Sequence, residues 1–443
     1  MSRCLLPSGL SLLAVSASLA SVALLPAAAQ AQGVPVKTFT RPAAELAEPY
    51  SALRGVRELS DGRVVVTDNR DKVVHLVDLR AQRVTRVGRE GSGPNEYQMP
   101  ATVLSLPGDS TLISDPLNSR FLVLGPGGTP AGTWIPGGGG GGEAPSRAGG
   151  DRPATRPVPV APGGAAAGAP GGRGGPAFVM AGGPGGPMQM LATRAVDAQG
   201  RVYFTGSPIA ITPEGPKPAD SLPIIRADRR SMQGDTVAWL QVPKGNTQVN
   251  ASGGNMNIRI GGGPFAAEDG WTVLPDGRVV VVRHADYHVE VYPASGRGAP
   301  ARGAPVPGAA LRVTEAEKQA WREERAANAP IAIARTVNAG PGGTTTRSEA
   351  VNIAAQEPDS WPATMPLFVG NQVYATPTGE IWVGRYRAAT DKNPRYDVFD
   401  ATGRRTGQVV FPPRTRILGF GKGVVYTARA DEDDLQYLQQ WAR

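Results

Sequence analysis

The sequence predicts an all-β fold made of several small sheets, and three observations lead to this expectation. Glycine and proline contribute 58 and 42 of the 443 residues, and both interrupt helices and favour turns. A short unit of strands and turns recurs along the chain, and an extended segment without an obvious partner precedes its first copy. An all-helical bundle is therefore disfavoured, and the length suits one large β unit with insertions.

The recurring unit passes from an apolar patch through a tight turn into an alternating strand, then through a polar loop into a second one. Asp-Gly and related turns supply the positive φ that two-residue hairpin loops require. A single small sheet cannot hide both of its faces from water, whereas several sheets stacked radially can. Six copies therefore predict a six-bladed β-propeller, with a β-sandwich or two small barrels as the alternative. The copies span residues 58–88, 105–134, 195–240, 272–298, 373–411 and 416–442.

We expect an N-terminal strand to close the ring. The sixth copy ends after what reads as its third strand, so its fourth strand must come from elsewhere in the chain. The extended segment at residues 34–40 (VPVKTFT) is the available partner for the outer edge of the last blade. Pairing there removes an exposed strand edge and fastens the ring.

A first insertion is expected at residues 136–187, where 19 glycines and 10 prolines occur among 52 residues. Such a stretch cannot bury enough surface to offset the entropy lost on ordering, so we expect disorder. The propeller itself should occupy residues 32–443 around this insertion.

A second insertion is expected at residues 299–365, before the fifth copy. Thr314 and Glu317 form a capping box ahead of strong helix formers, which predicts a single exposed helix at residues 314–328. A flexible glycine-rich stretch at residues 338–346 should follow this helix.

Residues 1–31 read as an export signal, with one cation at Arg3, an apolar stretch and small residues before the expected cleavage site. A retained membrane anchor is the alternative, but the apolar run is shorter than the ~20 residues that a spanning helix needs. Cys4 is the only cysteine and lies inside this signal, so the exported chain should contain no disulfide or thiolate metal site. We therefore expect a periplasmic or extracellular protein.

The net charge of +8 comes from cations spread along the whole chain. Nucleic-acid-binding proteins tend to concentrate cations on one stripe with aromatic side chains between them. The spread predicts a solvated basic surface, with no nucleic-acid partner and no stable membrane insertion after signal cleavage. We expect a monomer.

Two segments carry a family resemblance. The link between the first two copies contains Gly88, Gly91, Gly93, Pro94, Glu96 and Tyr97, and residues 361–387 lead through a proline-containing stretch into the strand motif GEIWVGR. Both resemble the bacterial exported six-bladed propellers related to NHL-repeat proteins. The resemblance implies the six-bladed fold and no particular activity, because that family is largely of unknown function.

The loops between the second and third strands, together with the links between blades, are expected on one face, the usual ligand platform of a propeller. Converging arginines there favour carboxylate or phosphate ligands through bidentate hydrogen bonds. The alternative is that these charges tie neighbouring blades together as ion pairs and loop caps. The candidate ligand-binding residues are Asp68, Arg70, Asp115, Arg120, Arg283, His284, Arg385, Arg387 and Arg429, with Asp391 and Arg395 on the same face.

No catalytic residue, metal or other cofactor is assigned from the sequence. His284 and His288 are the only cluster that resembles a metal site, but a strand–loop–strand does not reliably place both rings on one side. Oxygen ligands for a calcium ion in the channel could come from Asp68, Asn69, Asp115 and Asn118. No Gly-x-Ser-x-Gly elbow presents a nucleophile.

The combination of a repeated scaffold with no catalytic grouping predicts a non-enzymatic exported binding or scaffold module. It should recognise a protein, a peptide or an anionic glycan through an arginine-rich loop face. The alternative is a metal-dependent hydrolase or lactonase with its site in the propeller channel.

Overall fold

The computed structural model of the chain describes residues 34–136, 190, 192–212, 215–242, 247–252, 255–260, 263–328, 331–340, 343–352, 358 and 360–443. The expected export signal at residues 1–31 and residues 137–187 of the first expected insertion lie outside the described residues. The propeller is formed within Pro35–Arg443.

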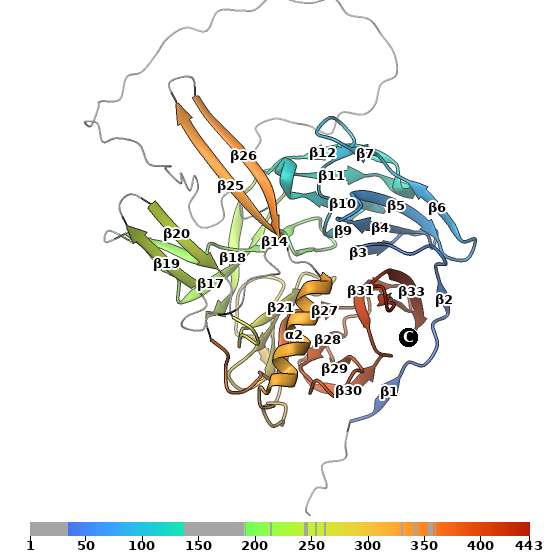
Figure 1. The fold of residues 1–443 in the computed structure, drawn as a ribbon, viewed down its shortest axis with the longest axis vertical. Coiled ribbons are helices and arrows are strands. Elements are labelled where there is room, and N and C mark those ends of the chain that lie inside the picture. The colour runs from blue at the N-terminus through green and yellow to red at the C-terminus, as the bar shows by residue number, and fades with distance from the viewer. Residues whose placement is uncertain are drawn as a thin grey trace, which may run out of the picture. The chain divides into compact units, whose positions relative to one another are not determined.

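Six antiparallel sheets arranged about a common centre confirm the six-bladed β-propeller (Figure 1). They are called blades 1 to 6 in chain order. Blade 1 contains β3 (Leu53–Glu58), β4 (Val64–Asp68), β5 (Val73–Asp78) and β6 (Arg83–Arg86). Blade 2 contains β9 (Val103–Leu106), β10 (Ser110–Asp115), β11 (Arg120–Leu124) and β12 (Pro130–Trp134). Blade 3 contains β13 (Ala195–Val196), β14 (Val202–Thr205), β17 (Ser221–Ala227) and β18 (Gly234–Gln241).

The remaining three blades follow the same order along the chain. Blade 4 contains β21 (Gly270–Val273), β22 (Val279–Arg283), β23 (His288–Tyr292) and β24 (Ala301–Arg302). Blade 5 contains β27 (Phe368–Ala375), β28 (Ile381–Arg385), β29 (Arg395–Phe399) and β30 (Arg405–Val410). Blade 6 contains β31 (Thr415–Gly421), β32 (Val424–Ala430) and β33 (Gln436–Ala442). The first strand of each blade is the innermost, since β3 contacts β9 and β31, and β21 contacts β13 and β27.

The core lies between the blades and follows from the two-residue period of each strand. In β4, Val64 and Val66 pack into a cluster shared with blade 6, whereas Val65 packs into a cluster shared with blade 2. All three side chains are fully buried, although successive residues point to opposite faces of the sheet. Burial of one such side chain stabilises the fold by about 1.5–3 kcal/mol, so every blade depends on both of its neighbours.

An N-terminal strand closes the ring, as expected, but a different segment from the expected one does so. β2 (Ala44–Glu45) pairs antiparallel with β33 and supplies the fourth strand of blade 6. The predicted segment at residues 34–40 instead contains β1 (Val36–Thr38), which pairs parallel with β30 as a fifth strand of blade 5. Pro42 separates the two pairings because it has no N–H to donate, and hydrogen bonding to β33 begins with the Ala43 N–H.

The expected helix is present as α2 (Glu315–Asn328) in the link between blades 4 and 5. At its start the Glu317 carboxylate accepts hydrogen bonds from the backbone N–H and the hydroxyl of Thr314. The helix is not exposed on all sides, because Glu317 is buried and its carboxylate also accepts the Ala389 N–H at 3.0 Å. A single carboxylate therefore joins α2 to the loop between the second and third strands of blade 5.

Further hairpins leave the blades without joining their sheets. β15 (Ile209–Thr212) and β16 (Gly215–Pro218) interrupt blade 3 between its second and third strands, where the sequence has its proline-rich excursion. β19 (Thr247–Ser252) and β20 (Asn255–Ile260) lie in the next link. β25 (Ile331–Gly340) and β26 (Gly343–Asn352) form a hairpin that includes much of the stretch expected to be flexible. A short parallel pair, β7 (Arg89–Glu90) and β8 (Glu96–Tyr97), lies in the first link. Two 3-10 turns, η1 (Pro116–Asn118) and η2 (Pro126–Gly128), complete blade 2.

Among the described residues, no helix has the length and apolar content required to cross a lipid bilayer.

The closing strand can be tested through Leu46, which follows β2 and is 1% exposed in the cluster between blades 6 and 1. We expect Leu46→Ala to lower the free energy of unfolding by about 2–5 kcal/mol, because it leaves a cavity at the ring closure. Val36→Ala on β1 is the matched control, since Val36 is 57% exposed and its loss should cost less than about 0.5 kcal/mol. Urea denaturation measures both, and equal losses would contradict closure through β2.

The docking of α2 should depend on pH through Glu317. Hydrogen bonds from the Ala389 N–H and the Thr314 hydroxyl lower the pKa of Glu317 from 4.5 to about 2. The stabilisation from this carboxylate is therefore complete above pH 4.5 and is lost as the pH falls towards 2. Glu317→Gln should cost about 1–3 kcal/mol of unfolding free energy at neutral pH. The difference from the unsubstituted protein should shrink below pH 4.5, and a difference that stays constant in acid would argue against the assignment.

Candidate functional site

One face of the propeller carries the loops between second and third strands and the links between blades. Successive antiparallel strands reverse direction, so connections after the second and fourth strands emerge at one edge and those after the first and third at the other. The hairpin β15–β16, the hairpins β19–β20 and β25–β26, and helix α2 all belong to connections of the first kind. We call this side the loop face, and all of the sequence-predicted site residues lie in or next to its connections.

The two predicted acids of blades 1 and 2 are buried loop caps. Asp68 accepts the backbone N–H of Ala52 at 2.6 Å and that of Arg70 at 2.8 Å. Asp115 accepts the Met99 N–H at 2.9 Å and the side-chain amide of Asn118 at 2.6 Å. Each carboxylate thereby ties the loop at the end of a second strand to the start of the same blade. Their oxygen atoms are occupied by donors, which does not suit a shared calcium site.

Two predicted arginines hold chain segments together. The Arg120 guanidinium donates to the carbonyl oxygens of Gly93 and Glu96, both at 2.9 Å, and so fixes the link that contains β7 and β8. The Arg429 guanidinium donates two hydrogen bonds to Glu45, at 2.9 and 2.8 Å. Because Glu45 belongs to β2, Arg429 fastens the closing strand of the ring.

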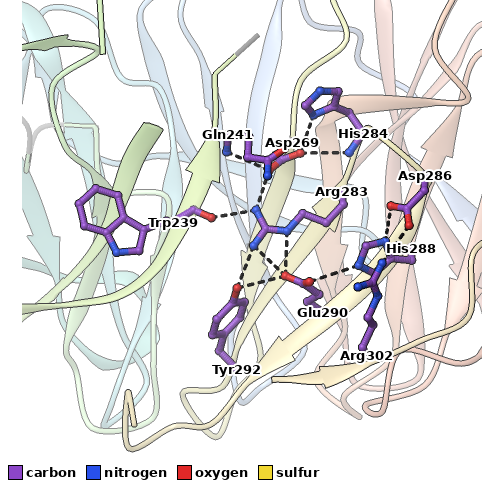
Figure 2. Close-up of polar contacts among 10 residues, drawn as sticks. All are labelled: Trp239, Gln241, Asp269, Arg283, His284, Asp286, His288, Glu290, Tyr292 and Arg302. Atoms are coloured by element: carbon purple, nitrogen blue, oxygen red, sulfur yellow. Dashed lines mark hydrogen bonds and ion pairs between the residues drawn. The ribbon is translucent and has the colours of Figure 1, made fainter. Parts of the chain in front are cut away.

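Arg283 is the centre of a buried network that joins blades 3 and 4 (Figure 2). Its guanidinium contacts Asp269 and Glu290 at 2.7 Å each, the Tyr292 hydroxyl at 2.8 Å and the Trp239 carbonyl oxygen at 2.9 Å. Burial opposes ionisation of Asp269, but hydrogen bonds from His284, Gln241 and Arg283 outweigh it and lower the pKa of Asp269. This arginine is fully engaged by protein groups and joins two blades.

The two loop histidines contact different carboxylates. His284 lies on Asp269 with an Nδ1 to Oδ1 distance of 2.7 Å, whereas His288 contacts Asp286 at 2.5 Å and Glu290 at 3.2 Å (Figure 2). Among the described residues, no group of three or more His, Cys, Asp or Glu side chains is placed to hold a metal ion.

The remaining predicted arginines divide between blades 1 and 5. Arg70 is exposed in the loop between β4 and β5 of blade 1. Arg385 contacts the buried Asp397 at 3.0 Å, and the Arg387 Nε–H donates to the Asp391 carbonyl oxygen at 2.9 Å. Arg385 and Arg387 line one cavity, of about 330 Å³, together with Arg395. The nine predicted residues are therefore spread around the loop face and do not form one site.

A second set of arginines lies at the propeller axis and was missed in the sequence. Arg54 belongs to β3, Arg194 directly precedes β13 and Arg416 belongs to β31, so all three occupy the loop-face ends of innermost strands. The sequence does contain a signal for them, in the strand starts LRGV, TRAV and TRIL.

Arg194 shows that this set reaches into the centre of the ring. Its Nη2 donates to the Asn371 carbonyl oxygen at 3.1 Å, so a side chain from blade 3 contacts the innermost strand of blade 5. On the way its guanidinium lies 5.7 Å from the ring centroid of Trp271 in blade 4. Because this contact links blade 3 to blade 5, the Arg194 side chain extends across the innermost strand of blade 4, on the side that faces the propeller axis.

Arg416 and Arg54 lie together on the other side of the axis. The Arg416 Nη2 donates to the Leu53 carbonyl oxygen at 2.8 Å, and the Arg54 Nε donates to Asn69 Oδ1 at 2.9 Å. Burial lowers the pKa of Arg54, and the positive charge of Arg416 lowers it further. Burial likewise lowers the pKa of Arg416 and of Arg194.

Glu268 precedes the innermost strand of blade 4, and its negative charge opposes the lowering of the Arg194 pKa. Burial raises the pKa of Glu268, although Arg194 and His284 oppose this shift. It packs against Gly370 of blade 5, where an added Cβ would meet its Cγ at 2.5 Å. We call Arg54, Arg194, Arg416 and Glu268 the axial cluster. It combines three guanidinium groups with one carboxylate whose ionisation is disfavoured.

No family model matches the sequence, and no curated protein matches it either. Solved structures that are similar include a DUF4221 family member from Bacteroides vulgatus, with 9% identity and a TM-score of 0.37 over 91% of this chain and 98% of that one. Virginiamycin B lyase from Staphylococcus aureus has 9% identity and a TM-score of 0.38 over 91% and 98% of the two chains. The calcium-binding protein regucalcin from Agrobacterium tumefaciens has 10% identity and a TM-score of 0.31 over 92% and 97%. Similarities this distant carry no argument about activity, and the propeller assignment rests on the sheets themselves.

The network around Arg283 can be tested by removing one buried partner. We expect Asp269→Asn to lower the free energy of unfolding by about 3 kcal/mol or more, because the buried Arg283 loses a charged partner. Asp276→Asn provides the control, since the Asp276 side chain is 54% exposed and its pair with Arg278 should contribute less than about 1 kcal/mol. Chemical denaturation measures both variants, and a small effect of Asp269→Asn would refute a structural role for this network.

Proposed function

We propose that this protein is an exported binding module that holds an anionic group on its loop face, at the axial cluster. The ligand is a peptide, a protein or a glycan that presents a carboxylate or phosphate to Arg54, Arg194 and Arg416. The observation that carries the proposal is the reach of Arg194 across blade 4 to Asn371, which brings a third guanidinium to the axis.

The hydrogen bonds of two axial arginines support this assignment. Arg194 donates to a backbone carbonyl, and Arg416 donates to the Leu53 carbonyl and to Gln436 Oε1 at 3.4 Å. Neither forms an ion pair with a carboxylate in the described parts of the chain, unlike Arg283, Arg385 and Arg429. A guanidinium has five N–H donors, so each keeps donors for an external anion.

The electrostatic environment of the cluster also favours an anion. Burial and the positive charge of Arg416 both lower the pKa of Arg54, so these two guanidinium groups repel each other. A bound carboxylate or phosphate reduces the repulsion between these guanidinium groups and can accept two hydrogen bonds from one of them. By contrast, Arg120, Arg283 and Arg429 on the loop face are each engaged by groups within the protein.

The site can be tested with anionic probes and variants of the axial arginines. We expect the double substitution Arg194→Gln and Arg416→Gln to weaken binding of oligogalacturonate or of a polyglutamate peptide at least tenfold, since each charge-assisted hydrogen bond contributes about 1.5–3 kcal/mol. Raising the salt concentration from 50 to 200 mM should weaken binding to the unsubstituted protein much more than binding to the variant. Isothermal titration calorimetry measures both effects.

Arg83→Gln is the matched control, because Arg83 is an exposed cation on β6 at the outer edge of blade 1. It should leave probe affinity unchanged within about twofold, as expected for a screened surface charge. Binding that falls equally in the control and in the axial variant would show attraction to net charge and would overturn the proposed site. Hydrolysis of a lactone or ester panel that a chelator abolishes, with metal found by elemental analysis, would instead favour a metal-dependent hydrolase.

A further inference from the structure

A separate cavity of about 330 Å³ opens on the loop face at blade 5. One wall comes from the link after blade 4 and includes Leu311 and Leu367. The rest of the lining includes Arg385, Arg387 and Arg395, from the loop between β28 and β29 and its flanking strand ends. Apolar side chains and three guanidinium groups therefore line the same cavity.

The cationic wall is held in place by its own loop. The Arg387 Nε–H donates to the Asp391 carbonyl oxygen at 2.9 Å, and the Arg395 Nε–H donates to the Asp391 carboxylate at 2.8 Å. Both contacts use Nε, and within the described chain the Nη groups of Arg387 and Arg395 have no hydrogen-bond acceptor. Arg385, the third arginine of the lining, has its guanidinium carbon 5.2 Å from the ring centroid of Tyr287. Fixed arginines with uncommitted donors are the arrangement that binds an anion at low entropic cost.

The loop is also fixed from outside the cavity. The Asp391 N–H donates to the Ala388 carbonyl oxygen at 2.9 Å, and the buried Glu317 of α2 accepts the Ala389 N–H at 3.0 Å. The positions of Arg387 and Arg395 are therefore set before any ligand arrives. The helix of the second insertion contributes to this cavity by supporting its loop.

The charged side chains that line the cavity give it a net positive charge. Asp391 is the carboxylate in its lining, and Asp397 beneath Arg385 also contacts Arg405 at 2.6 Å. Burial opposes ionisation of Asp391, but hydrogen bonds from Arg395 and the Asn393 N–H outweigh it and lower the pKa of Asp391. Three guanidinium groups thus face one carboxylate in the lining, and the wall carries a net positive charge.

We infer that this cavity binds a carboxylate carried by a short branched aliphatic group. The carboxylate lies against Arg387 and Arg395, and the aliphatic group lies against Leu311 and Leu367. The volume is at the lower end of the range of about 300–1,000 Å³ found for ligand sites, which suits one group of this size. The carboxylate can belong to a free acid or to the C-terminal leucine of a peptide.

This inference does not rest on the axial cluster, because none of the axial residues lines the cavity. It uses two of the predicted ligand residues, Arg385 and Arg387, for a ligand smaller than the macromolecule proposed for the axis. The two sites can therefore fail independently.

The test compares 4-methylpentanoate with 4-methylpentanamide, which has the same aliphatic group and no charge. Calorimetry or ligand-observed NMR on the full chain should show the acid binding at least tenfold more tightly than the amide. Arg387→Gln and Arg395→Gln should each weaken binding of the acid about tenfold and leave binding of the amide unchanged. Comparison of Gly-Gly-Leu with 4-methylpentanoate distinguishes the two sources, since a peptide end predicts tighter binding of the tripeptide and a free-acid site predicts tighter binding of 4-methylpentanoate.

Arg404→Gln is the matched control, because Arg404 lies on the opposite face of blade 5, in the turn after β29, with a side chain 79% exposed. It should bind the acid as the unsubstituted protein does, and circular dichroism melts should show all three variants folded. Equal affinity for acid and amide would overturn the inference. So would binding of the acid that survives Arg387→Gln and Arg395→Gln but is lost on Arg416→Gln, because the axial cluster would then be the carboxylate site.

Discussion

Each blade packs against both of its neighbours, and this two-sided packing governs how the ring closes and where the charged loops lie. Val65 of β4 faces blade 2 while Val64 and Val66 face blade 6, so neither face of the sheet reaches water. A ring with one missing strand would leave such a face open, which explains why β2 and Leu46 must reach blade 6. The N-terminal segment also adds β1 to blade 5, so one stretch of chain secures the two last blades.

Closure of the ring also determines what the charged residues of the loop face do. Connections from all blades meet on that face, and carboxylates such as Asp68, Asp115 and Asp269 cap loops or pair with arginines between blades. Arginines at the ends of innermost strands lie at the axis, where Arg194 and Arg416 contact carbonyl oxygens. Arginine therefore has two roles on this face. Which role an arginine has depends on whether its strand is the innermost one or lies farther out in the blade.

Sequence reasoning weighed both roles for the predicted residues without deciding between them. Asp68 and Asp115 follow apolar strands directly, a pattern that suits a ligand group as well as a loop cap. Arg429 was expected at a ligand surface and instead fastens Glu45, which is 384 residues away in the chain. No local pattern predicts such a pairing, because it exists only once the ring has closed. The predicted set covers the loops between second and third strands and the strand ends beside them, and it does not include Arg54, Arg194 and Arg416, which lie at the starts of innermost strands.

The number of blades, the position of helix α2 and the use of an N-terminal strand for closure can be predicted from the amino-acid sequence. These features depend on local patterns: strand alternation, Gly-containing turns and the capping residues Thr314 and Glu317. Three further features emerge only in the folded ring: the N-terminal segment that closes blade 6, the arginines that meet at the axis and the arginines that line the cavity of blade 5. The physical reason is that these contacts join residues far apart in the chain, and their distances are set by the circumference of the ring.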